Sequence, residues 1–176
     1  GLDWRRNVIT EIGLVLGKVA LDGSVAVEAR FSSLVFVGVE HYQDAARASA
    51  ITGIDLDALW RAPHFLSVIS DVRALMDRAD ILAAFNADFD VPFLSAAFLR
   101  CQVDVPALLA SEVVLDPLVW SRALDRYSKG HKLVEVAKRR GAVLAGGERA
   151  HRADYDAELE IGSAHVCTPV TFLYLV

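Results

Sequence analysis

The chain has 176 residues, of which 54% are hydrophobic and 23% charged, so it is long enough for one domain with a sizeable core and is not intrinsically disordered. Its net charge of −5 excludes a protein that coats nucleic acid by bulk charge, although local basic patches are compatible with it. Two cysteines exclude a disulfide framework, and the apolar stretch 166–176 is shorter than the ~20 residues of a membrane-spanning helix. We therefore expect a cytoplasmic protein.

The first third of the chain predicts an antiparallel hairpin followed by a helix. Residues 8–30 are rich in β-branched side chains and are interrupted by Leu21-Asp22-Gly23-Ser24, a sequence typical of hairpin turns. Residues 33–40 predict a further extended segment. Residues 43–50 predict a short helix that ends at Thr52-Gly53.

From Pro63 onward, helices alternate with buried strands. Apolar residues at helical spacing predict a helix between Pro63 and Asp80. The apolar runs 81–85 and 113–115 predict strands that are buried on both faces. Further helices are expected over residues 90–101, after Asp116-Pro117, over 131–140 and from 152 onward. The pattern predicts an α/β fold of three layers, with a mixed β-sheet flanked by helices.

The segment from Asn86 to Asp90 places acidic residues where a buried strand ends and a helix begins. Asn86 or Asp88 is expected to cap the helix with its side-chain oxygen. Asp90 falls in or beside the first turn, where the helix dipole favours the ionised carboxylate. Ligand sites of open α/β sheets lie beyond the carboxyl ends of the strands. An isolated segment of this kind is more often only a helix cap, so a capping role stays open beside a functional one.

A second segment, residues 151–156, places a histidine five residues before an acid. On one regular helix His151 and Asp156 would diverge by about 140°. They converge only if His151 lies in the loop after Gly146-Gly147 and Asp156 lies in the opening turn. Ala153 between them allows the helix to approach the sheet closely. The alternative is a solvated helix start that is rich in charge.

Together, Asn-x-x-Phe-Asp after a buried strand and His-x-Ala-x-x-Asp on a late helix resemble the DEDDh 3′–5′ exonucleases. This family includes the proofreading epsilon subunit of DNA polymerase III and ribonuclease T. The segments Ile51-Thr52-Gly53-Ile54 and 113–118 (VVLDPL) also resemble stretches of the family, and the likeness extends over residues 1–160. It implies a ribonuclease H-like fold.

The resemblance implies a role for each matching residue. Asp90 and Asp156 would be carboxylates of a site for two Mg²⁺ or Mn²⁺ ions, which activate a water and stabilise the leaving oxygen of a phosphodiester. His151 would be the general base that takes a proton from that water. Asn86, Phe89 and Arg152 would bind the substrate; for Phe89, core packing is the alternative to stacking on a base.

The implied activity is 3′–5′ exonuclease hydrolysis that releases nucleoside monophosphates from nucleic-acid 3′ ends, with DNA favoured over RNA. A single-stranded 3′ end and a DNA polymerase subunit are the expected partners. The alternative is a catalytically inert module that binds nucleic acid or a polymerase. A ribonuclease of the same family differs in how it handles the 2′-hydroxyl group, and the sequence does not separate the two.

Both ends of the chain depart from the family pattern. The family's first motif is Asp-x-Glu on its first strand, and Gly1-Leu2-Asp3 resembles the end of the turn that follows it. We therefore expect that an N-terminal part is missing and that the chain as printed is largely inactive. Residues 161–176 contain Gly162 and Pro169, which break helices, so we expect a domain over residues 1–160 followed by a foreign tail.

Positive charge is concentrated in the last third of the chain. A rim that follows the phosphates of a bound strand and a solvated helix face are equally compatible with this pattern. The basic residues are Lys129, His131, Lys132, Lys138, Arg139, Arg140, Arg149 and Arg152.

Overall fold

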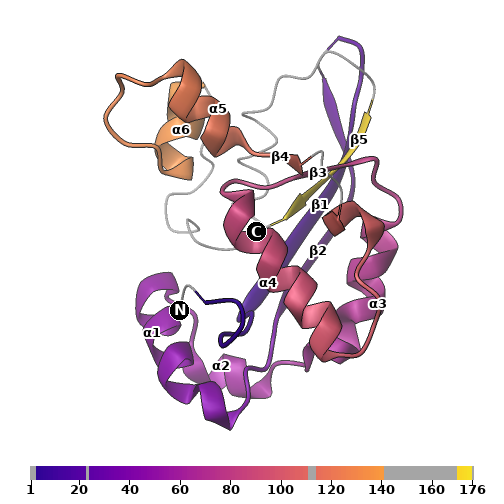
Figure 1. Ribbon diagram of the computed structural model, residues 1–176, viewed down its shortest axis with the longest axis vertical. Coiled ribbons are helices and arrows are strands. Elements are labelled where there is room, and N and C mark those ends of the chain that lie inside the picture. The colour runs from indigo at the N-terminus through magenta and orange to yellow at the C-terminus, as the bar shows by residue number, and fades with distance from the viewer. Residues whose placement is uncertain (1–2, 23, 111–113, 141–169, 176) are drawn as a thin grey trace.

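The computed structural model describes residues 3–22, 24–110, 114–140 and 170–175, the last segment by its backbone alone. Figure 1 shows an elongated molecule in which helices pack against a twisted sheet. The elements in chain order are β1 (Glu11–Val19), β2 (Val25–Leu34), η1 (Val39–His41), α1 (Tyr42–Thr52), α2 (Leu56–Arg61), α3 (Phe65–Met76), β3 (Ile81–Ala83), α4 (Ala87–Arg100), η2 (Ala107–Ala110), β4 (Val114–Leu115), α5 (Pro117–Leu124), α6 (Leu133–Arg139) and β5 (Val170–Leu175).

The sheet is mixed and has five strands in the order β2-β1-β5-β3-β4. β1 is antiparallel to both of its neighbours, β2 and β5, whereas β3 is parallel to β4 and β5. Leu14, Val15 and Leu16 of β1 are fully buried, so this strand is covered on both faces. The predicted mixed sheet with flanking helices is confirmed.

The predicted hairpin is confirmed as β1 and β2. Asp22 stabilises the connecting turn, because its carboxylate accepts hydrogen bonds from the backbone N–H (2.9 Å) and the hydroxyl (2.6 Å) of Ser24. The prediction of a separate extended segment over residues 33–40 is wrong. β2 continues to Leu34, and the N–H of Phe36 then donates to the carbonyl of Pro63 instead of pairing with a strand.

The helices α1 and α3 form where the sequence predicts them. α1 ends at Gly53, whose left-handed backbone (φ 73°) donates its N–H to the carbonyl of Ser49. α3 begins two residues after Pro63. The short helix α2 was not predicted, although Asp55 caps it by accepting the N–H of Asp57.

The main core lies between one face of the sheet and the helices α3 and α4. Alternate residues of β1 point to this face, and the rings of Phe65 and Phe98 meet edge to face with centroids 5.7 Å apart. Figure 1 shows α4 crossing this face of the sheet. The fully buried large side chains are Ile12, Leu14, Leu16, Leu59, Met76, Leu82, Leu94 and Phe98.

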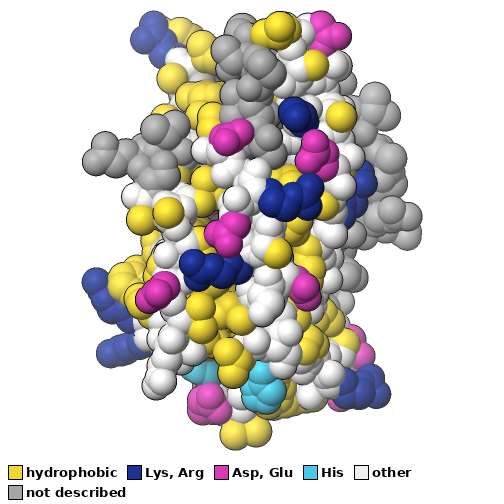
Figure 2. Space-filling view, turned by 90° about the vertical axis from the view of Figure 1, so that its right-hand side faces the viewer, with side chains coloured by type: hydrophobic (Ala, Val, Ile, Leu, Met, Phe, Trp, Pro, Cys, Tyr) yellow, Lys and Arg dark blue, Asp and Glu magenta, His cyan; other side chains and the backbone are white. Residues whose placement is uncertain are grey.

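The face that carries α3 and the edge strand β2 mixes charges of both signs (Figure 2). Arg78 pairs with Glu28 of β2 (3.2 Å), and Arg73 pairs with Asp77 (3.6 Å). No continuous basic surface covers the described part of this face. No helix in the described ranges is long and apolar enough to cross a membrane.

Residues 170–175 form β5, which lies inside the sheet between β1 and β3. Residues 161–169 and the helix expected from 152 onward lie outside the described residues. A place in the sheet does not test where a sequence comes from. The domain of residues 1–160 and the foreign origin of residues 161–176 therefore stay predictions.

The position of β5 predicts that a break in this strand destabilises the whole sheet. Leu173 pairs with Leu16 on one side and with Leu82 on the other. Leu173→Pro removes a backbone N–H from this interior strand, so we expect a loss of about 3 kcal/mol in the free energy of unfolding. Urea unfolding followed by circular dichroism measures it. Leu173→Val is the control, and equal midpoints for both variants would contradict the pairing.

Candidate functional site

The candidate site lies where β3 and β4 end. These strands are parallel and in register, with Leu82 opposite Val114 and Ala83 opposite Leu115, so their carboxyl ends reach the same edge of the sheet. Asp116 follows β4 directly, and the chain from β3 passes through Phe85 into α4. Asp116 and the first turn of α4, which carries Asp88 and Asp90, therefore meet at this edge.

The side chain of Asp116 joins the two helices that begin here. Its carboxylate accepts the N–H of Leu118 at the start of α5 (2.8 Å), as expected for an N-cap followed by Pro117. The same carboxylate accepts the N–H groups of Asn86 (3.0 Å) and Ala87 (3.1 Å) at the start of α4. One carboxylate thus caps the starts of both helices.

The prediction that Asn86 or Asp88 caps α4 is wrong. Asn86 occupies the N-cap position, but its backbone is left-handed (φ 70°) and its side chain makes no capping hydrogen bond. Asparagine tolerates this conformation better than most residues. α4 therefore begins at Ala87, three residues before the predicted start, because the cap comes from Asp116 on the neighbouring strand.

Asp90 lies in the first turn of α4, as predicted, but the expectation that the helix dipole keeps it ionised is wrong. Burial, together with the negative charge of Asp116, raises the pKa of Asp90 to about 7. For this half-buried carboxylate, the free-energy cost of lost hydration is larger than the stabilisation that the helix dipole provides. Asp90 is thus poised to change charge near neutral pH.

Two cavities meet at Phe89 and Asp90. The first, of about 210 Å³, has mostly apolar walls and also contains His41 and Asp44 of the η1–α1 segment. The second is an open groove of about 680 Å³ that leads from Asn86 along α5 to the start of α6. The structure therefore brings together Asn86, Phe89 and Asp90. His151, Arg152 and Asp156 lie outside the described residues, so their predicted roles stay predictions.

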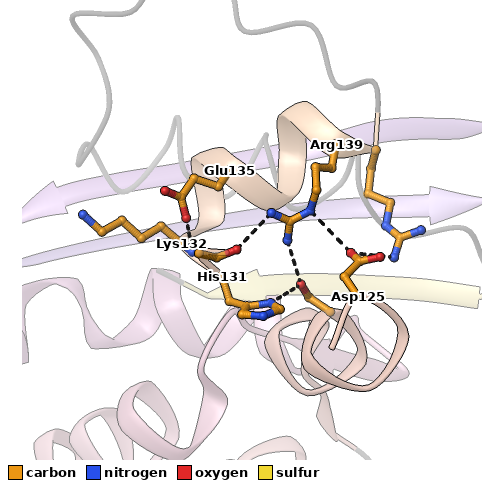
Figure 3. Close-up of polar contacts among 8 residues, drawn as sticks. Asp125, His131, Lys132, Glu135 and Arg139 are labelled. Carbon is orange, nitrogen blue, oxygen red and sulfur yellow. Dashed lines mark hydrogen bonds and ion pairs between the residues drawn. The ribbon is translucent and has the colours of Figure 1, made fainter. Parts of the chain in front are cut away.

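Within the described residues, members of the predicted basic cluster have two kinds of surroundings (Figure 3), and Arg149 and Arg152 lie outside those residues. His131 contacts the buried hydroxyl of Ser121 (2.9 Å), and Arg139 donates to the carbonyl of Gly130 (2.9 Å). Arg139 and Arg140 also pair with Asp125, at 3.5 and 3.1 Å. These side chains join α6 to α5 and the loop between them.

Lys132 has the second kind of surroundings. Its backbone N–H donates to the carboxylate of Glu135 (3.1 Å), while its side chain points away from the polar cluster (Figure 3) and lines the open groove.

Sequence reasoning missed three features of this site. The sequence marks Asp116 only as the end of a strand. Its capping of α4 depends on the pairing of two strands, which no local sequence pattern reveals. His41 reaches the smaller cavity without any motif around it. Arg122 lines the groove, and its spacing of four residues from Leu118 on α5 is the one signal that was available. Among the described residues, no three His, Cys, Asp or Glu side chains form a group that could hold a metal ion.

The double cap predicts a large effect of Asp116→Ala on stability. The variant leaves three backbone N–H groups without their acceptor, so we expect the free energy of unfolding to fall by about 2–3 kcal/mol. Urea unfolding at pH 5 isolates this effect, because Asp90 is then neutral and the repulsion between the two carboxyls is absent. Asp116→Asn keeps one acceptor oxygen and should lose less. A loss below about 0.5 kcal/mol for the alanine variant would contradict the cap.

The raised pKa of Asp90 predicts how stability depends on pH. In the unfolded chain Asp90 ionises near its ordinary pKa of 3.8, and in the folded protein near 7. The free energy of unfolding is therefore highest below pH 4, where the carboxyl is neutral in both states, and falls as the pH rises to 7. Asp90→Asn removes this loss, which is up to about 4 kcal/mol.

Thermal unfolding with a chelator present should show Asp90→Asn and wild type alike at pH 4, and the variant more stable at pH 8. Asp88→Asn, which removes an exposed carboxylate from the same turn, is the control. A difference that stays constant between pH 4 and pH 8 would refute the expected titration.

Comparison with solved structures supports the fold. A structure described as "3'-end specific recognition of histone mRNA stem-loop by 3'-exonuclease" matches 88% of this chain and 79% of that chain, with a TM-score of 0.59 and 16% sequence identity. At this identity the likeness shows the fold alone. The fold is ribonuclease H-like, as the sequence predicts.

Two curated relatives are similar in sequence. The chain is 32% identical to the 3'-5' exonuclease DinG of Staphylococcus saprophyticus over 108 residues, which are 61% of this chain and 11% of DinG. It is 33% identical to the PolC-type DNA polymerase III of Oceanobacillus iheyensis over 143 residues, 81% of this chain and 9% of the polymerase. The chain therefore spans about a tenth of the length of these relatives.

A family model named RNase_T and described as "Exonuclease" matches residues 1–162. The match includes the segments around Asp90 and Asp156 on which the predicted resemblance depends. Because it covers nearly the whole sequence, the chain belongs to the exonuclease family.

Proposed function

We propose that this domain is a metal-dependent 3′–5′ exonuclease that removes nucleoside monophosphates from the 3′ end of a single strand, preferentially DNA. The observation that carries the proposal is the place of Asp90, at the junction of a nucleobase-sized cavity and an open groove beyond the ends of β3 and β4. Family membership supports it, as do the relatives named as a 3'-5' exonuclease and as a polymerase.

The carboxylate of Asp90 has the donor chemistry that a divalent metal ion prefers. The exonuclease family generally depends on divalent metals. Mg²⁺ and Mn²⁺ bind carboxylate oxygens, and the nearby charge of Asp116 disfavours ionisation of Asp90 unless a cation offsets it. In the proposal, Asp90 and Asp156 hold the ions. When bound, the ions supply activation of a water and stabilisation of the leaving oxygen.

The chain's own residues bind and orient the strand. The apolar wall of the smaller cavity, to which Phe89 and Phe93 contribute, accepts the terminal base. The rings of these two residues lie with centroids 4.7 Å apart, so Phe93 holds Phe89 in place. Asn86 and Arg152 contact the strand. His151 takes the proton from the attacking water, a role that histidine side chains commonly perform near neutral pH.

The partner in this proposal is a DNA polymerase, which the match to a PolC-type polymerase supports. We also propose a cytoplasmic location, which a chain with only two cysteines suits. A proofreading role would require that the 3′ end leaves the polymerase as a single strand before it reaches the groove.

The test uses the protein as its gene encodes it. A single-stranded DNA with a 5′ label should shorten one nucleotide at a time from its 3′ end with Mg²⁺, and should stay intact with a chelator. We expect Asp156→Ala to abolish the reaction and His151→Ala to slow it about 10²- to 10⁴-fold. His64→Gln, an exposed histidine at the start of α3, should react like wild type.

Equal digestion by wild type and Asp156→Ala would remove Asp156 from the proposal. Mg²⁺-independent binding without any shortening would instead support the inert binding module. The same assay with an RNA strand decides between the two substrates.

A further inference from the structure

The open groove beside Asp90 has a function that the proposed chemistry does not by itself assign. Its lining comes from Asn86 and Phe89 of α4, from Leu118 and Arg122 of α5, and from residues 132–135 around the start of α6. Phe89 and Asp90 line both this groove and the smaller cavity, so the groove is adjacent to the site.

Two basic side chains line this groove. Arg122 and Lys132 are both exposed, and within the described ranges neither side chain forms an ion pair. Arg139 and Arg140 differ, because their guanidinium groups are paired with Asp125. The positive charge that faces the groove is thus available to a ligand, whereas the neighbouring charge stabilises the helix pair.

Glu135, an acidic residue of the groove, forms no ion pair with either cation among the described residues. The carboxylate of Glu135 is held by the backbone N–H of Lys132 and faces that backbone. Figure 3 shows the Lys132 side chain extending away from this carboxylate. Guanidinium groups bind phosphate with two parallel hydrogen bonds, and ammonium groups bind it as point charges.

We propose that Arg122 and Lys132 bind the phosphodiester backbone of the strand whose 3′ end occupies the site, upstream of the bond that is cut. This inference rests on the proposed function. It predicts that Arg122 and Lys132 determine affinity for a strand of several nucleotides but take no part in the chemistry of one phosphodiester bond. Because phosphate contacts carry no sequence information, the affinity is independent of base sequence.

A first experiment measures binding without hydrolysis. The probe is a fluorescein-labelled oligothymidylate of twelve nucleotides, with Ca²⁺ in place of Mg²⁺. We expect Arg122→Gln and Lys132→Gln each to raise Kd by about 3- to 10-fold. Each should also reduce the slope of log Kd against log salt concentration by about one, the amount expected for the loss of one phosphate contact. Lys138→Gln is the matched control, an exposed lysine of α6 that does not line the groove, and should change Kd less than 2-fold.

A second experiment separates the groove from the catalytic site in the protein as its gene encodes it. The double variant carries both Arg122→Gln and Lys132→Gln. For the oligonucleotide, its KM should be about 10-fold higher or more, and its kcat should change less than 2-fold. For the p-nitrophenyl ester of thymidine 5′-monophosphate, which has a single phosphodiester, wild type and double variant should give equal kcat/KM.

The outcomes are distinguishable. If both substrates are hydrolysed and the double variant matches Lys138→Gln in binding and in KM, the phosphate role of the groove is refuted while the exonuclease proposal stands. If neither substrate is hydrolysed but the variants weaken oligonucleotide binding, the groove assignment stands and the proposed function fails. Equal loss of activity on both substrates would place Arg122 and Lys132 in the chemistry instead and overturn the inference.

Discussion

The hydrogen bonds of the Asp116 carboxylate hold together the part of the fold on which the candidate site depends. This side chain accepts three backbone N–H groups at the starts of α4 and α5, those of Asn86, Ala87 and Leu118. Pro92 lacks the N–H that would bond the carbonyl of Asp88, so the first turns of α4 have one internal bond fewer. The start of α4, and with it the position of Asp90, therefore depends on a residue of the neighbouring strand.

The same carboxylate contributes to the electrostatics of the site. Burial is the main cause of the raised pKa of Asp90, and the negative charge of Asp116, which stabilises two helix N-termini, raises that pKa further. The arrangement costs stability above neutral pH when no cation is close. A divalent ion beside Asp90 would offset that cost, so the proposed metal would stabilise this edge of the sheet when bound.

How far the sequence predicts this protein depends on whether a signal is local. The hairpin around Asp22 and the helix after Pro63 follow from turn chemistry and apolar spacing, and both are confirmed. The predicted start of α4 is wrong because the cap comes from Asp116, about 30 positions along the chain. The predicted charge state of Asp90 is wrong because burial, and after it the charge of Asp116, raises the pKa of Asp90. Family resemblance placed Asn86, Phe89 and Asp90 in one site, and the structure brings them together. The roles of His151 and Asp156 stay predictions.

The strand β5 has a consequence for how the protein folds. Leu16 and Leu173 are neighbours in the sheet but lie about 150 residues apart along the chain, a separation that costs much loop-closure entropy. Until β5 is in place, β1 and β3 expose unpaired backbone edges on either side of the same gap. During synthesis on the ribosome, the hairpin and the early helices would wait with an open sheet, and this interval is when association with another nascent chain is most favoured.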